Sequence, residues 1–516
     1  MAQTEQAEHR EQWGTRWGFL FAAIGSAIGL GNIWRFPYIA YTNGGGAFFV
    51  PYLFALLTAG IPLLVLEYVI GHKHRGATAL SWRRLSRKGE FIGWWQMLVS
   101  FIIATYYAVI LGWALAYCYF SIGSRWGDDP GAFLDSYLQP AAQPGIVGSL
   151  VPGVLIPLLI VWGATLIILL GGVKKGIEAA NKVMIPTLFV TFFIVVVRGL
   201  TLPGATEGLN ALFTPDFSAI TDGSVWVAAY GQIFFSISVG FGIMVVYSSY
   251  LPRSSDLTNN AFIAGFTNSA FELLAGIGVF GALGFLAVQE NVPVGQVADE
   301  GTTLAFAIFP EILNQLPAFN SAFAFLFFLS LTLAGMSSLI SITEVYCAGL
   351  RDKYGLSRRT AVAVGCGASA VLSLVYATEG GTYFLTVADY FINNFGLVLI
   401  GLAEAIMVGW VLRQVGTMQR HANELSDIRL GRWWPAMIVF VTPVMLIYMT
   451  ISNAITTVTV GIPGQPYPGW FLFWFGWVVA LAALLLGVVL TLARWDPAVV
   501  RLDESERPVY EQAGQA

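Results

Sequence analysis

The residues with the clearest potential for chemistry lie inside the first long apolar segment, at positions 23–32. This stretch contains Gly25, Gly29 and Gly31 and ends at Asn32, all poor helix formers, so we expect the helix to break here. At membrane depth an unwound backbone is tolerated only where it is buried in protein or lines a cavity, because lipid offers no hydrogen-bond partners. Freed carbonyls suit a hard cation, and the positive end of a half-helix suits a carboxylate. The stretch therefore predicts a binding site for a cation and an anionic group.

The elements that must position this stretch are membrane spans. Of the 516 residues, 56% are hydrophobic and only 11% are charged, and the mean hydropathy is +0.70. Soluble domains carry about 25% charged residues, so the composition predicts an all-α polytopic membrane protein. The net charge of −4 gives no indication of nucleic-acid binding. We count about twelve apolar segments, at 15–42, 46–72, 91–122, 147–170, 177–199, 225–250, 258–288, 319–350, 359–376, 383–414, 433–454 and 468–494.

The distribution of basic residues predicts the orientation of these spans. Lysine and arginine gather in the connections after the second, fourth, eighth and tenth segments, whereas the loops at 289–318 and 455–467 have none. The positive-inside rule places both termini in the cytoplasm of a multi-pass protein of the cell's inner (plasma) membrane. The N-terminal apolar run resembles a secretory signal, but it continues into further spans, so we expect a retained helix. Residues 302–309 could form a short helix over the outer face, and a surface loop is an equal alternative.

A second interrupted helix is expected at residues 231–242, which mix glycines with Ser236 and Ser238 at mid-span. Glycine in a membrane helix more often serves close packing, and for one segment alone we would favour that reading. Interruptions in both the first and sixth segments instead indicate inverted repeats with a substrate site between them. The expected organisation is a cytoplasmic segment (1–14), a first repeat (15–199), an extracellular loop (200–224), a second repeat (225–414) that includes the loop at 289–318, two further spans (415–494) and a cytoplasmic tail (495–516).

Cysteine and histidine give no sign of metal or redox chemistry. The cysteines lie in apolar stretches without paired spacing, and the histidines fall in polar connections, so neither a disulfide framework nor a catalytic site is expected. These residues are Cys118, Cys347, Cys366, His9, His72, His74 and His421. We find no nucleophile with a base, no Walker-type loop and no redox motif, so an enzyme and an organic cofactor are not expected.

At these residues the chain resembles the neurotransmitter:sodium symporter family, and most closely its bacterial amino-acid members of the leucine-transporter type. The matching motifs cover the first ten spans, whereas the last two match in hydropathy only. They lie at 10–13, 29–38, 43–48, 175–178, 208–217, 231–236, 334–338 and 401–404. The resemblance implies a five-plus-five inverted repeat (LeuT-type fold) with broken helices 1 and 6 and two peripheral helices. It also implies sodium-driven uptake by alternating access.

The resemblance implies two sodium sites built mostly from neutral oxygens, as a small hard cation prefers. The first would use the carbonyl of Ala27 and the side chains of Asn32, Ser236 and Asn268, together with the substrate carboxylate. The second would use the carbonyls of Gly25, Ile28 and Ala334 and the hydroxyls of Ser337 and Ser338. Taken alone, the two adjacent serines would more often be helix-packing hydroxyls.

For the organic substrate, the resemblance turns on Gly29. Monoamine-carrying relatives have an aspartate there, so glycine implies a substrate that brings its own carboxylate. Such a pocket, without charged side chains, would suit a neutral hydrophobic amino acid. The resemblance implies that the substrate is bound by Ser26, Ala27, Leu30, Gly31, Ile103, Tyr107, Phe235, Ser238, Phe241, Ser338 and Ile342. Relatives that carry betaine, GABA or taurine-like osmolytes can also have glycine here, so that class is the alternative substrate.

The resemblance also implies two gates and an acid that replaces chloride. The outer gate would be Arg35 with Asp389, and the inner gate would be formed by Arg10, Trp13, Ser249, Tyr250 and Asp352. Chloride-dependent relatives have a serine where this chain has Glu272, and we expect this carboxylate, beside Tyr52 and Gln232, to stand in for the anion. Proton counter-transport through Glu272 would follow. Glu67 is expected to bond to N–H groups freed at a broken helix, and Glu404 is a further buried acid.

Two other classes of membrane protein remain open at this point. A sensor that binds an amino acid without transporting it would have a similar sequence, but its gates and ligands need not all be intact. A channel is a third class, against which discontinuous helices and closely spaced gates argue.

Overall fold

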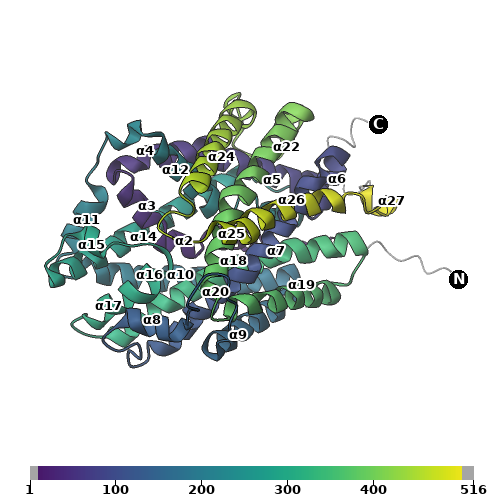
Figure 1. Cartoon of the computed structure of the whole chain (residues 1–516). Helices are drawn as coiled ribbons and strands as arrows, with labels where there is room; N and C mark the ends of the chain where they lie inside the picture. The colour runs from purple at the N-terminus through teal and green to yellow at the C-terminus, as the bar shows by residue number, and fades with distance from the viewer. Residues whose placement is uncertain (1–9, 502–516) are drawn as a thin grey trace.

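The computed structural model describes residues 10–501 and is almost entirely helical, with only isolated β-bridges in that range (Figure 1). Most of the acidic tail predicted after residue 495, with Glu504, Glu506 and Glu511, lies outside the described residues. Between residues 10 and 501, ten helices are long and apolar enough to cross a membrane. They cover Gly46–His74, Arg87–Phe120, Pro152–Leu170, Val173–Leu200, Leu257–Glu290, Asn320–Tyr354, Arg358–Ala377, Gly381–Val411, Trp433–Thr459 and Gly469–Leu490.

The first predicted span is an eleventh crossing, made by a bent pair. Helix α1 (Arg16–Ala27) is followed, after a break at residues 28 and 29, by α2 (Leu30–Trp34) and α3 (Phe36–Thr42). The two halves meet at 56°. The expected break therefore lies within the glycine-rich stretch.

The sixth predicted span is also divided, into α12 (Gly223–Ser236) and α13 (Ile243–Ser249). Between them Ser238, Gly240 and Gly242 have φ of +59°, +86° and +77°, a conformation that L side chains rarely adopt. A Cβ on Gly242 would also come within 2.3 Å of a Thr78 methyl group. Neither half is long enough to count as a continuous span, which explains why eleven crossings, rather than the predicted twelve, are found by length and composition.

At the centre of the bundle, α1 packs against α10 (Ala179–Leu200), α14 (Leu257–Glu290) and α18 (Asn320–Tyr354), and α18 packs in turn against α7 (Glu90–Phe120). By contrast, α24 (Thr442–Thr459) and α26 (Val478–Leu490) expose large apolar side chains such as Ile451 and Leu485. An apolar exposed face suits contact with lipid. The last two predicted spans are thus peripheral, and the broken helices lie at the centre.

Two sets of short helices mark the two ends of the molecule. At one end are α11 (Ala205–Phe213), α15 (Val294–Val297) and α17 (Phe309–Asn314), and at the other are α6 (Thr78–Leu85) and α27 (Pro497–Val500) (Figure 1). The helix considered for residues 302–309 is present as α16 (Gly301–Thr303) and the π-helical turn η6 (Leu304–Ile308). Its Phe306 ring packs against Trp34, Trp113 and Tyr117, so this segment covers the outer half of the first span.

Candidate functional site

The two helix breaks meet each other in the core of the bundle. The Ser238 hydroxyl donates to the Ser26 carbonyl oxygen at 2.9 Å, and the two serine hydroxyls lie 3.4 Å apart. Both side chains are buried. The two unwound segments therefore hydrogen-bond to each other. An unwound backbone at this depth needs such protein partners, because lipid provides none.

The predicted ligands of the first sodium site are brought together at these breaks. The Asn32 amide nitrogen donates to the Asn268 amide oxygen at 2.8 Å, and the Gly29 N–H donates to Asn32 Oδ1 at 3.0 Å. One end of the Asn268 amide lies 3.2 Å from the Ala27 carbonyl oxygen, and the other lies 3.0 Å from Ser236 Oγ. Four neutral oxygen-bearing groups thus converge in a buried place, a donor set that fits sodium.

The predicted ligands of the second site also converge. Ser337 Oγ lies 2.7 Å from the Gly25 carbonyl oxygen and 2.9 Å from that of Ala334. Ser338 Oγ lies 3.2 to 3.5 Å from the carbonyl oxygens of Ala334, Gly25 and Ile28. Both hydroxyls donate to carbonyls of their own helix and of the broken helix. The set again consists of neutral oxygens, and it joins α18 to the end of α1.

The space between these two sites contains polar groups that suit a carboxylate. Tyr107 Oη lies 3.4 Å from the Leu30 backbone nitrogen, at the first turn of α2. A Cβ placed on Gly29 would lie 3.3 Å from Tyr107 Oη and 3.4 Å from Ser338 Oγ. Free N–H groups at a helix start favour an anion. A side chain at position 29 would point into this space.

The remaining predicted pocket residues surround the same region. The Phe235 ring lies directly over Gly31, where an added Cβ would come within 2.2 Å of a ring carbon. Ile103, Phe241 and Ile342 are all buried, and the Phe241 carbonyl accepts a hydrogen bond from Ser100 at 2.7 Å. No charged side chain belongs to this predicted set.

The outer pair, Arg35 and Asp389, is not joined directly. Neither residue forms an ion pair with the other in the part of the chain that the structure describes. The Arg35 guanidinium instead lies over the Phe235 ring at 5.1 Å, and Asp389 Oδ1 accepts a hydrogen bond from Asn393 at 2.8 Å. The predicted residues are therefore in the same region but have other partners.

The predicted inner gate is fully assembled. Arg10 Nη1 lies 3.1 Å from both carboxylate oxygens of Asp352, and its Nε donates to Ser249 Oγ at 3.0 Å. The same guanidinium lies 5.0 Å from the centre of the Tyr250 ring. Trp13 donates to the Tyr247 carbonyl at 2.8 Å. These contacts tie the segment before α1 to α13 and to the end of α18.

Sequence reasoning missed the ion network that surrounds this gate. Glu11 accepts from Arg351 at 2.7 Å and from Arg358 at 3.1 Å, and Arg358 also forms an ion pair with Glu344 at 2.9 Å. Tyr250 donates to Glu344 at 2.8 Å. We call Arg10, Glu11, Glu344, Arg351, Asp352 and Arg358 the inner ion cluster. An acidic residue at 344 inside an apolar span was the signal that could have revealed it.

The charge environment of Glu11 is strongly cationic. Burial alone would raise the pKa of this carboxyl, but the Arg358 guanidinium, the Val173 N–H and Arg351 together hold it below its usual value. Glu11 Oε2 accepts the Val173 N–H at 2.8 Å, where the fifth span begins. Glu11 is thus ionised at neutral pH and joins three spans to the N-terminal segment.

Glu272 lies fully buried in α14 with the two predicted partners. The Gln232 amide donates to Glu272 Oε1 at 2.6 Å, and the Tyr52 hydroxyl donates to Oε2. The same hydroxyl lies 2.8 Å from Ser269 Oγ. A buried carboxylate is costly without such donors. Two donors aimed at one anionic group form the kind of site that a halide would otherwise occupy.

Two further buried acids flank the second break. Glu67 Oε1 accepts the Gly240 N–H at 2.8 Å, so it bonds to an N–H in the break between α12 and α13, as expected. Glu404 Oε1 accepts the Gln96 amide at 2.7 Å. The Glu67 contact therefore attaches the unwound segment to a surrounding helix, whereas the Glu404 contact joins two intact helices.

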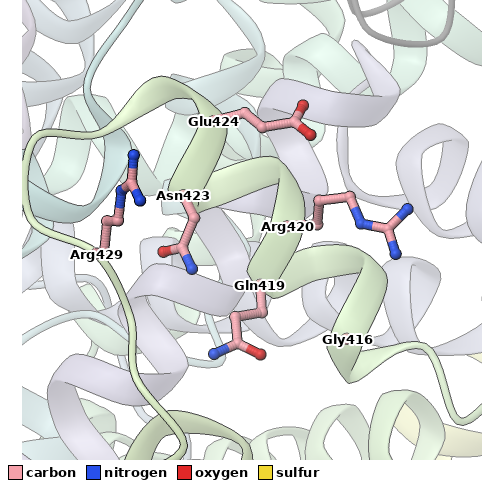
Figure 2. A pocket seen from close by; sticks show the side chains of 6 residues that line it. All are labelled: Gly416, Gln419, Arg420, Asn423, Glu424 and Arg429. Carbon is pink, nitrogen blue, oxygen red and sulfur yellow. The ribbon is translucent and has the colours of Figure 1, made fainter.

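A surface hollow of about 560 Å³ lies elsewhere, over α22 (Val415–Leu425). Figure 2 shows that its two basic side chains, Arg420 and Arg429, lie on opposite sides of the helix and do not point toward each other. A shared ligand would need convergent groups. We therefore place the functional site at the two breaks.

The model of the sodium:neurotransmitter symporter family matches residues 10–130 and 147–496. The chain is 40% identical over 482 residues to an uncharacterized sodium-dependent transporter of Methanocaldococcus jannaschii, covering 93% of this chain and 97% of that one. It is 31% identical to the sodium-dependent dopamine transporter of Bos taurus, over 93% of this chain and 74% of that one.

Among solved structures, the chain is similar to the crystal structure of MhsT in complex with L-phenylalanine. The TM-score is 0.74 at 30% identity, covering 86% of this chain and all of that one. This likeness confirms the LeuT-type fold expected from the resemblance. One conclusion follows from the helices of spanning length, the two helix breaks in the core and these matches. The chain is a multi-pass, sodium-dependent transporter that belongs to the sodium:neurotransmitter symporter family.

Proposed function

We propose that this transporter imports a neutral hydrophobic amino acid together with sodium by alternating access. The observation that carries the proposal is the space beside Gly29, bordered by Tyr107 Oη and Ser338 Oγ. With no acidic side chain at position 29, the substrate itself must supply a negative charge to the neutral sodium ligands. A carboxylate there would meet the Tyr107 hydroxyl and the N–H groups at the start of α2.

The substrate's side chain would lie among Ile103, Phe235, Phe241 and Ile342, because the predicted pocket contains no charged group. A charged side chain would lose its hydration there without gaining a partner. The likeness to MhsT, whose structure holds L-phenylalanine, supports an apolar amino acid. One methylene group changes affinity by only about 1–3 kcal/mol, so several apolar side chains would be accepted.

Two sodium ions would be carried with the substrate. The first would bind at Ala27, Asn32, Ser236 and Asn268 and would be completed by the substrate carboxylate. The second would bind the Gly25, Ile28 and Ala334 carbonyls and the two serine hydroxyls of α18. Neutral ligands favour reversible binding, because an ion held without formal countercharge is released more easily when the site opens.

Glu272 would make transport independent of chloride. Its carboxylate already accepts from Tyr52 and Gln232, so a fixed negative charge occupies the place of a mobile anion. On the return step, with sodium and substrate gone, the same carboxyl would take up a proton and carry it outward. The Glu272→Ser variant should therefore transport less in chloride-free buffer, and added chloride should restore its transport. Uptake by this variant that does not respond to chloride would contradict the role.

Uptake into proteoliposomes tests the main proposal. Labelled amino acids are offered with an inward sodium gradient and with chloride replaced by gluconate. Accumulation of an apolar amino acid that requires sodium but not chloride is the expected result. Binding without accumulation would indicate a sensor, and accumulation only with chloride would overturn the role of Glu272.

An osmolyte is the second candidate substrate, because the relatives include a sodium- and chloride-dependent GABA transporter of Bos taurus at 30% identity. Gly29 is compatible with such a carboxylate. Betaine, GABA and taurine therefore belong in the same uptake panel. Competition by osmolytes that exceeds competition by apolar amino acids would favour this class.

A further inference from the structure

The outer part of the tenth predicted span contains a distortion that the proposed function does not use. Helix α20 (Gly381–Phe391) continues into a π-helical turn, η8 (Ile392–Leu397), before α21 (Val398–Ile406). Such turns insert an extra residue into a helix and occur often at functional sites. This one presents two neighbouring asparagines, Asn393 and Asn394.

The two asparagines have different surroundings. Asn394 is satisfied at both ends of its amide, because Nδ2 donates to the Tyr390 carbonyl at 2.9 Å and Oδ1 accepts from Asn453 at 3.1 Å. Asn393 donates to Asp389 Oδ1 at 2.8 Å, but its own Oδ1 is buried and has no hydrogen-bond partner among the described residues. A buried acceptor without a donor is costly, so it calls for an explanation.

One available donor, Arg35, lies across a small cavity from this oxygen. Arg35, Phe235 and Asn393 line the same space of about 10 Å³, which is close to the lower limit of about 10–15 Å³ for one water molecule. The Arg35 guanidinium lies over the Phe235 ring. A guanidinium has five N–H donors, and the face of an aromatic ring satisfies none of them fully.

We propose that Asn393 is the third residue of the outer gate, holding Asp389 through its amide nitrogen and offering its oxygen to Arg35, directly or through one water molecule. An amide can do both because it is donor and acceptor at once, whereas a second carboxylate would repel Asp389. Asn393 is thus a positioning residue that joins two charges which do not touch each other. The proposal rests on the proposed transport function and on the gating role that the resemblance implies for Arg35 and Asp389.

Labelling from the outside tests this role without requiring a known substrate. Ile103→Cys places a reporter in the buried pocket below the gate, and the three native cysteines are themselves buried. In sodium buffer, Asn393→Leu should raise the rate of labelling by a membrane-impermeant maleimide about fivefold to tenfold, because the gate loses its connecting amide. The matched control Asn394→Leu makes the same change at an asparagine that bonds to Tyr390 and Asn453 rather than to either gate residue, so labelling should stay within about twofold of the reporter alone.

A double-mutant cycle separates positioning from general damage to the helix. If Asn393 acts through Arg35, then Asn393→Leu should change the labelling rate by less than about twofold in an Arg35→Gln background. The proposal would be overturned if Asn393→Leu raised the labelling rate equally with and without Arg35→Gln. It would also be overturned if Asn393→Leu had no effect in the reporter with native Arg35. Asn393→Ser repeats the test if the leucine variant does not fold. Because no amino acid is present, failure here is distinct from failure of the proposed substrate.

Discussion

The two gates differ in how their charges are paired. On the inner side, six charged residues form two paired groups that Tyr250 links, because its ring lies under Arg10 and its hydroxyl donates to Glu344. In one group Arg10 reaches both oxygens of Asp352, and in the other Glu11 bridges two arginines. On the outer side, Arg35 rests on an aromatic ring and Asp389 is held by a neutral amide. The predicted inner gate is therefore held by directly paired charges, whereas the charges of the predicted outer gate are not paired with each other.

This difference has a simple physical basis. Ion pairs that are largely buried resist separation, because each charge left alone would remain poorly solvated. A cation over a ring is held by a weaker and less directional attraction, about 0.5–2 kcal/mol. A transporter that must admit substrate from outside needs the outer barrier to yield first. The difference in charge pairing agrees with the proposed direction of import.

Breaking the inner gate should have the largest effect. Asp352→Asn leaves Arg10 partly buried without a countercharge, and it weakens the acceptor for the Ala77 N–H, which lies 2.6 Å from Asp352 Oδ2. We expect sodium-driven accumulation to fall at least about tenfold, because removal of one partner from a buried pair costs several kcal/mol. Uptake and labelling from the cytoplasmic side measure the two consequences.

Arg198→Gln serves as the control and should transport normally, because the half-buried Arg198 bonds to the neighbouring Thr201 and lies over the Phe323 ring, away from both gates. Normal accumulation by Asp352→Asn would mean that the inner ion cluster does not hold the gate closed.

Breaking the outer pair should have a smaller effect. Asp389→Asn keeps a side chain that can bond to Asn393 but removes the charge that faces Arg35. Because the two charges are not in direct contact, we expect the KM for substrate to rise about threefold to fivefold with little change in maximal rate. Initial uptake rates over a range of substrate concentrations measure this. If Asp389→Asn reduced uptake as much as Asp352→Asn does, the two gates would not differ in strength.

The pH dependence should be the smallest effect near neutrality. Despite its burial, Glu11 has a pKa held below its usual value of 4.5, chiefly by Arg358. A lowered folded-state pKa gives stability that is present above the unfolded pKa and lost as pH falls through the folded value. Cytoplasmic-side labelling, taken relative to an exposed reporter cysteine at the same pH because thiolate reactivity itself falls with pH, should therefore be constant from pH 7 to about 5 and rise only below the usual carboxyl range.

Glu11→Gln sharpens this test, because the variant has no carboxyl at this position. It should label faster at neutral pH and show less change on acidification. An increase in labelling of the native chain between pH 7 and 6 would assign the sensitivity to another group.

The breaks in the two helices could be predicted from the sequence, because residues of these types are unusual in a membrane span. Three glycines and an asparagine within residues 23–32 conflict with helix propensity, and the break does fall within that stretch. The family motifs then identified ligands that lie up to about 300 positions apart along the chain. In the structure these ligands do converge, for example where Ser337 meets Gly25. Their roles as sodium ligands stay predictions until transport is measured.

The inner ion cluster, the partners of Arg35 and the π-turn at Asn393 were decided only by the tertiary structure. Hydropathy and the positive-inside rule place arginines at the cytoplasmic face, but they do not say which acid each arginine meets. Arg358 and Glu11 are separated by most of the chain and meet only after α1, α18 and α19 (Arg358–Ser373) pack together. Local sequence determines whether a helix can form and where it breaks, because those energies depend on neighbouring residues. Charge pairing and the loss of a hydrogen-bond partner depend on burial, and only the packed fold creates burial.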